Sequence, residues 1–147
     1  MRRLLLAVAV LASLSLSGCV DSGIQAAPLV VDSRIQTATL LTRTVPAGTT
    51  ERVAYFAFMN PDCSFGGYAE VRALSSPAHG TFAIQQGESY TNFGSNNQRY
   101  DCNKQKSRMI EVMYTPAAGY RGADEFAVLA IYPDGTTVSR RLAITVE

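Results

Sequence analysis

The side chains that could carry out chemistry in this 147-residue chain are few and widely spaced. His79 is the single histidine, which excludes a zinc or copper site built from several histidines. A Ser-His-Asp site would have to be built around His79, but the sequence has no G-x-S-x-G motif. No spacing selects two carboxylates for sugar hydrolysis from the four available, Glu88, Asp101, Glu111 and Asp124. The sequence also lacks a phosphate loop and a cofactor fingerprint, so it predicts a non-enzymatic protein without a cofactor. A hydrolase that uses His79 or one of these carboxylates is the alternative.

A polar segment, residues 86–106, contains the side chains best suited to binding. Tyr90, Phe93 and Tyr100 lie there among asparagines, glutamines and Arg99. This is the composition of recognition loops, because aromatic rings supply contact area and amides adapt their hydrogen bonds. A structureless loop of about 20 residues is long for a compact domain, so we expect it to contain a hairpin or to be pinned. These four residues are the predicted partner-binding set; the alternative is that the rings cover the core.

The N-terminal residues have the pattern of an export signal. Arg2 and Arg3 precede an apolar run that is too short to be a comfortable membrane span. The run ends in Leu16-Ser17-Gly18-Cys19, which resembles the lipobox of bacterial lipoproteins. The resemblance implies cleavage after Gly18 and acylation of Cys19, whose several acyl chains would form a stable membrane anchor. An ordinary secretory signal that happens to contain a cysteine is the alternative.

The lipoprotein resemblance also implies a domain organisation and a location. Residues 1–18 would be the signal peptide, residues 19–28 a short tether and residues 29–147 one domain. Val20 occupies the position where an aspartate favours inner-membrane retention in enterobacterial lipoproteins, so the outer membrane is favoured over the inner membrane. Loss of Arg2 and Arg3 changes the formal charge from +1 to −1, and we expect no nucleic-acid partner.

The two other cysteines, Cys63 and Cys102, would be exported as an even pair. An oxidising compartment favours a disulfide between them. The alternative is that the two cysteines form a metal or redox pair. The sequence has no C-x-x-C motif and a single histidine, which disfavours this alternative. The bond would close a loop of about 40 residues, for which the chain-entropy model gives on the order of 4 kcal/mol. It would also pin the polar segment to the loop that follows residues 51–59.

Short runs rich in β-branched and aromatic residues alternate with turn signals along the chain, and no window sustains a helical period. Pro133-Asp134-Gly135 is a strong hairpin signal because Asp-Gly supplies the positive φ of a tight turn. We expect an all-β fold, an antiparallel β-sandwich of about seven to eight strands. The expected strands are residues 29–31, 37–45, 51–59, 68–74, 81–85, 108–114, 125–132 and 137–146.

Alternation assigns the faces of the last two expected strands. In residues 125–132, one face holds Phe126, Val128, Ala130 and Tyr132. In residues 137–146, one face holds Val138, Arg140, Leu142, Ile144 and Val146. Residues 51–59 have largely apolar side chains on both faces, which favours a central strand or one partly covered by a loop.

Two motifs identify a relationship to known domains. Tyr114-Thr115-Pro116-x-x-Gly119-Tyr120-x-Gly122-x-Asp124-x-Phe126, with Asp134-Gly135 and a terminal strand, resembles the C-terminal half of bacterial immunoglobulin-like and cadherin-like domains. Ser76-Pro77-Ala78-His79-Gly80-Thr81-Phe82 resembles the turn that those domains carry upstream. The resemblance covers roughly residues 74–147 and implies an immunoglobulin-like sandwich.

Cadherin-like relatives hold calcium on acidic residues between tandem domains. Asp124 has no D-x-D companion here, so we expect it to cap a turn and expect no metal site, with calcium as the alternative. The sequence therefore predicts a cell-envelope lipoprotein whose non-enzymatic immunoglobulin-like domain mediates protein–protein interaction or has a structural or adhesive role. The alternative is a module that binds glycan or peptidoglycan. The expected partners are the membrane, through the anchor, and another envelope or surface protein.

Overall fold

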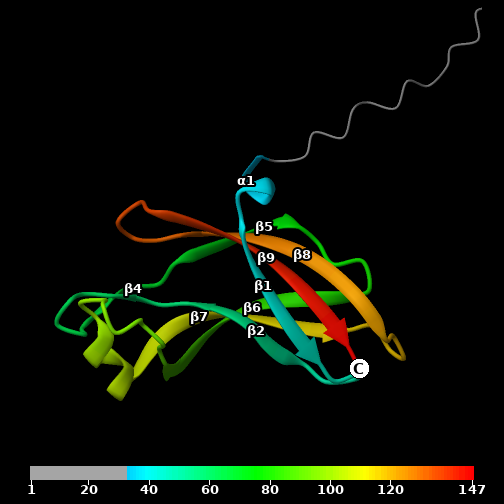
Figure 1. Cartoon of the computed structure of the whole chain (residues 1–147), viewed down its shortest axis with the longest axis horizontal. Helices are drawn as coiled ribbons and strands as arrows, with labels where there is room; N and C mark the ends of the chain where they lie inside the picture. Colours follow the sequence, from blue (N-terminus) through cyan, green and yellow to red (C-terminus); the bar gives the residue numbers. More distant parts are fainter. Residues whose placement is uncertain (1–32) are drawn as a thin grey trace, which may run out of the picture. The chain divides into compact units, whose positions relative to one another are not determined.

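The computed structural model describes residues 33–147 (Figure 1). The predicted signal peptide, Cys19, the tether and the strand at residues 29–31 lie outside the described residues. The described elements are α1 (Ser33–Gln36), β1 (Thr39–Val45), β2 (Glu51–Phe56), β3 (Phe58–Met59), β4 (Phe65–Gly67), β5 (Glu70–Ser75), β6 (Gly80–Tyr90), the 3₁₀ helix η1 (Tyr100–Lys104), β7 (Lys106–Pro116), β8 (Gly122–Ile131) and β9 (Thr137–Val146). No helix in residues 33–147 is long and apolar enough to cross a membrane.

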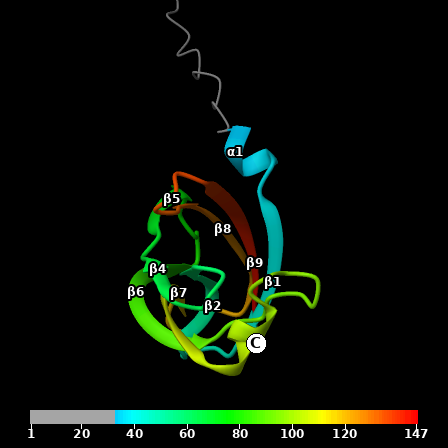
Figure 2. The same ribbon diagram turned by 90° about the vertical axis from the view of Figure 1, so that its left-hand side faces the viewer.

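Two larger sheets face each other across one hydrophobic core (Figures 1 and 2). One has the strand order β1-β9-β8-β5 and the other β2-β7-β6, while β3 and β4 form a separate pair. Phe126 of β8 stacks on Phe82 of β6 and on Tyr114 of β7, with ring centroids 5.2 and 5.9 Å apart. The predicted all-β class is confirmed, and the arrangement of the sheets is consistent with a sandwich.

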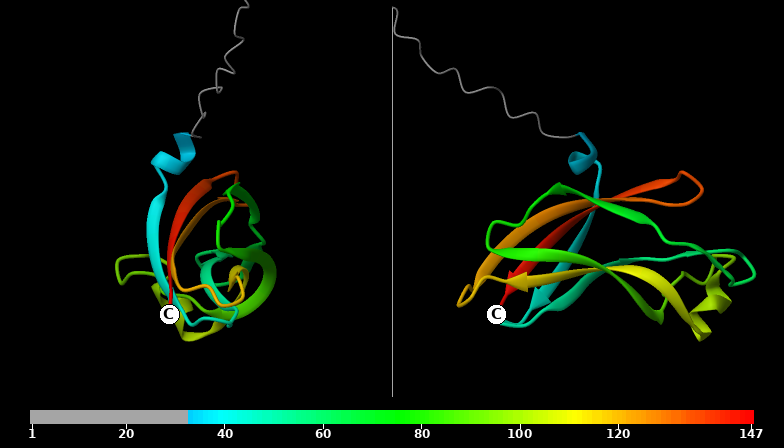
Figure 3. Two further views of the ribbon diagram at one scale, coloured as in Figure 1. Left: turned by 90° about the vertical axis from the view of Figure 1, so that its right-hand side faces the viewer. Right: turned by 180° about the vertical axis from the view of Figure 1, so that it is seen from behind.

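One strand pair departs from the predicted antiparallel arrangement. β1 runs parallel to β9, in register from Thr39 beside Arg140 to Val45 beside Val146. Figures 2 and 3 show these strands side by side. β1 is the first described strand and β9 the last, so no tight turn joins them and none imposes an antiparallel direction. The strand pattern alone contains no signal for this pairing.

The predicted strand at residues 51–59 is divided into β2 and β3. The register between β2 and β7 shifts between Arg52 and Ala54, which is a β-bulge. As a result the consecutive residues Val53 and Ala54 are both buried. The bulge explains why both faces of this segment look apolar in the sequence.

β6 is longer than the predicted strand at residues 81–85, because it continues to Tyr90. It pairs with β7 without interruption, from Gly80 opposite Pro116 to Tyr90 opposite Lys106. β6 ends its sheet, and most of its side chains are exposed, so polar residues such as Gln86 and Glu88 fit a strand here. The predicted polar loop therefore begins only after Tyr90, and it contains η1.

The predicted disulfide between Cys63 and Cys102 is confirmed, with a Cα–Cα distance of 5.3 Å. Cys102 lies in η1 and is fully buried. The Gln105 side chain adds a 3.5 Å hydrogen bond to the Cys63 carbonyl. The expectation that the polar segment is pinned is therefore confirmed.

The C-terminal hairpin also follows the prediction. Gly135 adopts a φ of 81°, and its N–H donates to the Tyr132 carbonyl at 2.9 Å. Among the residues that alternation places on one face of each strand, Phe126, Val128, Ala130, Leu142, Ile144 and Val146 are buried. Ala127 and Leu129 on the other face of β8 are buried too, as expected for a strand inside a sheet.

Candidate functional site

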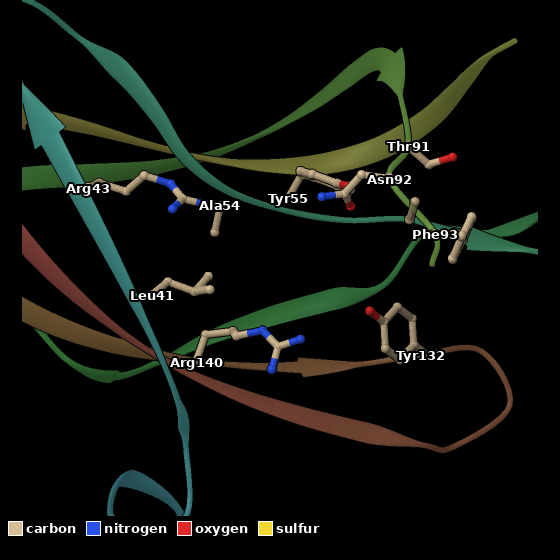
Figure 4. Close-up of a pocket in the computed structure, with 10 residues that line it drawn as sticks. Leu41, Arg43, Ala54, Tyr55, Thr91, Asn92, Phe93, Tyr132 and Arg140 are labelled. Carbon is tan, nitrogen blue, oxygen red and sulfur yellow. The ribbon is translucent and has the colours of Figure 1, made fainter. Parts of the chain in front are cut away.

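A cleft of about 330 Å³ opens between β1 and β2 (Figure 4). These two strands are the terminal strands of the two larger sheets. The lining residues come from β1, β2, the segment after β6 and the β8–β9 hairpin: Leu41, Arg43, Ala54, Tyr55, Ala57, Thr91, Asn92, Phe93, Tyr132 and Arg140. The volume lies within the range of small-ligand sites, which is about 300 to 1,000 Å³.

Two arginines reach this cleft from positions that alternate with core residues. On β9, Arg140 shares its face with the buried Leu142 and Ile144. On β1, Arg43 lies between Leu41, which packs against the core, and the buried Val45. Figure 4 shows the Arg140 guanidinium group in the open space between the strands and the Arg43 guanidinium group close to Ala54 of β2. An inward-facing position at this edge of the sandwich thus holds a cation instead of an apolar side chain.

The side chains that line this cleft include two arginines and no acidic residue among the ten. The four ion pairs found in residues 33–147 involve neither arginine. Arg43 donates a 2.8 Å hydrogen bond to the carbonyl of Thr42. Arg140 is partly buried, and within the described part of the chain it has no carboxylate partner. Charges in such a partly enclosed site act more strongly than in bulk water.

Tyr132 lies beside these arginines, and it remains a neutral hydrogen-bond donor at neutral pH. Burial raises the pKa of Tyr132, and the charge of Arg140 opposes this rise. Its ring stacks on Phe58 of β3, with centroids 5.6 Å apart. The hydroxyl and the exposed part of the ring are therefore held in position at the mouth of the cleft.

The far wall of the cleft is the segment from Thr91 to Phe93, which Asn103 holds in place. The Asn103 amide donates to the Phe93 carbonyl at 2.9 Å and accepts from the Phe93 N–H at 2.9 Å. Its oxygen also accepts from the Thr91 hydroxyl at 2.9 Å. On the same side of the cleft, the Tyr55 hydroxyl of β2 donates to the side-chain oxygen of Asn92 (Figure 4). Asn103 follows the disulfide-bonded Cys102 in η1, so the disulfide fixes the element that positions this wall.

A second hollow of about 240 Å³ continues the cleft towards the β8–β9 turn. It shares Ala57, Phe93 and Tyr132 with the first hollow and adds Arg99, Asp134 and others. Arg99 Nε donates to the Met59 carbonyl at 2.6 Å. Hydrogen bonds from the Thr136 hydroxyl and N–H lower the pKa of Asp134, so its carboxylate is ionised and held in the turn. We call the two hollows together the edge groove.

The four predicted partner-binding residues do not form one surface. Phe93 lines both hollows and Arg99 lines the second. Tyr90, at the end of β6, and Tyr100, at the start of η1, are about half exposed and line neither hollow. The residues that sequence reasoning missed are Arg43, Tyr55, Tyr132 and Arg140. One sequence signal could have identified Arg140: it is a charged residue on a strand face whose other residues are apolar.

Asp124 holds a turn, as predicted, but the turn is the one between β5 and β6. Its buried carboxylate accepts hydrogen bonds from the N–H groups of Ala78, His79 and Glu125, each at 2.9 Å. The Tyr114 hydroxyl donates a fourth hydrogen bond at 2.8 Å. Burial would raise the pKa of Asp124, but these four hydrogen bonds, that of Tyr114 first, lower it. The turn motif at residues 76–82 and the motif at residues 114–126 thus come together at this carboxylate. We call the carboxylate and its four hydrogen bonds the Asp124 clamp.

Three of the other titratable candidates have separate structural partners, and the fourth, Glu88, is exposed on β6. The His79 ring stacks on Tyr120, with centroids 4.2 Å apart. Glu111 pairs with Arg52 at 2.6 Å, and the exposed Asp101 pairs with Lys104 at 2.6 Å. No group of three or more His, Cys, Asp or Glu residues that could hold a metal ion occurs in residues 33–147.

Comparisons with known proteins give little for this chain. No family model matches it, and no curated protein matches it. A solved structure titled "Solution Structure of Amebosin" is similar with a TM-score of 0.36 and 11% sequence identity, covering 72% of this chain and 88% of that chain.

Proposed function

We propose that this protein is a non-enzymatic lipoprotein of the bacterial cell envelope whose immunoglobulin-like domain binds another envelope or surface protein in the edge groove. One observation carries the proposal: side chains suited to recognition, not to bond cleavage, converge on a groove with a fixed wall. The groove contains three arginines, two tyrosine hydroxyls, an amide and the carboxylate of Asp134. His79 and Asp124 lie together elsewhere and are engaged in structural contacts.

The strand order supports the immunoglobulin-like part of the proposal. In immunoglobulin domains one sheet contains strands A, B, E and D and the other contains C, F and G. Here β2-β7-β6 corresponds to B, E and D, and β5, β8 and β9 correspond to C, F and G. The first strand differs, because β1 pairs with β9 and thus extends the sheet of C, F and G. This correspondence agrees with the motif resemblance around Tyr114 and Asp124.

The anchor and the location rest on the lipobox-like Leu16-Ser17-Gly18-Cys19. The disulfide between Cys63 and Cys102 fits an exported protein, because disulfides persist in oxidising compartments. Residue Val20 after the anchor favours the outer membrane over the inner membrane. We expect wild-type protein to incorporate radiolabelled palmitate and to fractionate with membranes, and we expect Cys19→Ser to lose both properties. Retention of label by the mutant would refute the anchor.

Binding in the groove is tested by site-specific crosslinking in cells. A photoreactive phenylalanine analogue at Leu41, which lines the groove, is expected to give a discrete adduct with one envelope protein. The matched control carries the same analogue at Ile84, an exposed apolar residue of β6 outside the groove. Identical adduct patterns from the two positions would refute the groove as the binding site.

A glycan is the second candidate ligand, and the groove contains one feature that favours it. Phe93 and Tyr132 line both hollows and offer aromatic surface against which a sugar ring can pack. Co-sedimentation of the protein with purified cell wall, lost on Tyr132→Ala, would support this candidate. If the protein does not co-sediment with the cell wall, peptidoglycan is excluded as the ligand.

A further inference from the structure

We infer that the edge groove recognises an extended acidic segment of a partner protein, whose carboxylates pair with Arg43 and Arg140. This inference rests on the proposed binding function and names the chemistry of the ligand. Its basis is the charge of the groove together with the free strand edges that border it.

The charge of the groove selects an anion. Arg43 and Arg140 bring two permanent positive charges to a site whose ten lining residues include no carboxylate. Arginine binds carboxylates through two parallel hydrogen bonds, which gives geometric specificity as well as attraction. The Asn92 amide and the Tyr132 hydroxyl lie in the same cleft and supply neutral hydrogen-bonding groups around the anion.

The position of Arg140 has no structural explanation within the described residues. Its neighbours on the same face, Leu142, Ile144 and Val146, are buried in the core. An apolar residue at this position would extend that core, whereas a partly buried cation without a carboxylate partner is unfavourable. Sequences depart from consistent patterning mainly at functional sites. A carboxylate of the ligand would supply the ion-pair partner that the Arg140 guanidinium group lacks in the described residues.

The borders of the groove favour a polypeptide as the carrier of the carboxylate. β1 and β2 are the terminal strands of their sheets, so in the described part of the chain each has one backbone edge without a neighbouring strand. Such edges accept an extended peptide through main-chain hydrogen bonds. The aromatic residues that would enlarge a sugar platform, Tyr90 and Tyr100, lie outside both hollows.

The second hollow predicts the pattern of the peptide. Alternate side chains of an extended segment point to the same side. A carboxylate at Arg43 and Arg140 would be followed along the groove by a side chain near Phe93 and Tyr132. Arg99 lines the second hollow together with the ionised Asp134, so that hollow adds no net charge and favours an apolar side chain. An acidic residue at the two arginines, with an apolar residue at the next position on the same side, therefore fits the groove.

Fluorescence anisotropy with the purified, lipidated protein in detergent tests the inference. The probe is a fluorescein-labelled octapeptide in which pairs of glutamates alternate with pairs of valines, and the comparison peptide has glutamine in place of glutamate. We expect the glutamate peptide to bind at least about tenfold more tightly, because hydrogen bonds to charged groups are stronger than neutral ones. Its affinity should also fall as salt is raised.

Substitutions of Arg43 and Arg140 test whether the peptide binds in the groove. Arg43→Gln and Arg140→Gln should each weaken the glutamate peptide at least about tenfold, with unchanged circular dichroism and melting curves as evidence of folding. Arg121→Gln, at an exposed arginine outside the groove, is the matched control and should bind normally. Equal affinity for the two peptides, or no effect of either groove variant, would overturn the inference.

The experiment also separates this inference from the proposed function. Tighter binding of oligogalacturonate than of the glutamate peptide, with the same dependence on Arg140, would overturn the peptide assignment in favour of an acidic glycan. Absence of binding by both peptides, with the Leu41 crosslink still formed, would overturn the acidic segment and leave the proposed function standing. Loss of the crosslink would instead remove the proposed function on which the inference rests.

Discussion

Replacement of Asp124 by asparagine is expected to lower the free energy of unfolding by about 3 kcal/mol. The carboxylate accepts four hydrogen bonds, two at each oxygen. Asparagine keeps one oxygen for the Ala78 and Glu125 N–H groups, but its NH₂ group then faces the His79 N–H. The Tyr114 hydroxyl can rotate to accept, whereas the backbone N–H of His79 cannot.

The magnitude follows from the two groups at that second oxygen. Hydrogen bonds to a charged acceptor contribute about 1.5 to 3 kcal/mol each, and a buried donor left without a partner costs about 1 to 3 kcal/mol. The Asp124 side chain is buried, at 7% exposure, so water does not replace the lost contacts. A loss of this size is a large share of the 5 to 15 kcal/mol that is usual for a domain, as an order of magnitude.

Urea unfolding followed by circular dichroism at pH 7 measures this loss. Asp101→Asn is the matched control, because Asp101 is exposed and pairs only with Lys104 in a surface ion pair. Surface pairs of this kind contribute roughly 0 to 1 kcal/mol. If Asp124→Asn costs no more than Asp101→Asn, the Asp124 clamp does not stabilise the fold and the reasoning is refuted.

The same carboxylate makes stability depend on pH. The folded-state pKa of Asp124 is lowered, so its contribution is fully present above the pKa of an unfolded aspartate, about 3.9. The contribution is lost as the pH falls through the lower folded-state pKa. Wild-type protein should therefore lose stability below about pH 4, and Asp124→Asn should lose less over the same interval. Parallel curves for the two proteins would contradict this assignment.

Three further predictions concern the disulfide, a close approach of the backbone and the inward arginine. Replacement of both Cys63 and Cys102 by serine should reduce stability by on the order of 4 kcal/mol in urea unfolding and weaken the Leu41 crosslink, because the 39-residue separation is no longer closed and the groove wall loosens. Gly80→Ala should lower the free energy of unfolding by about 1 to 3 kcal/mol, since its Cβ would lie 2.6 Å from the Tyr114 hydroxyl oxygen; an unchanged melting curve would contradict this. Arg140→Leu should raise stability by about 1 kcal/mol while abolishing binding of the glutamate peptide, and a destabilised variant would show that the arginine has a structural role.

Sequence patterns predicted the fold class and the regular parts of the fold because those parts depend on local chemistry. The strand at residues 137–146 coincides with β9, and the Asp-Gly turn before it forms as expected. The disulfide between Cys63 and Cys102 forms as predicted, because the two cysteines that remain besides Cys19 allow one combination. Each of these features is determined by a few residues and a known spacing.

The features that sequence patterns missed depend on contacts between distant segments. The bulge at Val53 breaks the alternation of β2 through its pairing with β7, which no local propensity encodes. The parallel pairing of β1 with β9 joins the two ends of the described chain. The edge groove follows from both effects, since it requires Arg43 and Tyr55 to come together from two different sheets. The polar segment therefore contributed Phe93 and Arg99 to the groove, while Tyr90 and Tyr100 remained outside.

β8 connects the Asp124 clamp with the edge groove, which is the proposed binding region. Asp124 lies near its first residue, and Tyr132 follows its last residue. Eight residues of extended strand separate them by roughly 25 Å, well beyond the distance at which substitutions usually couple. One end of the sandwich is closed by the Asp124 clamp and the stacked rings of Tyr114 and Phe126. At the other end the disulfide and Asn103 hold the wall without filling the space between the sheets, so a groove can remain open there without loss of the core.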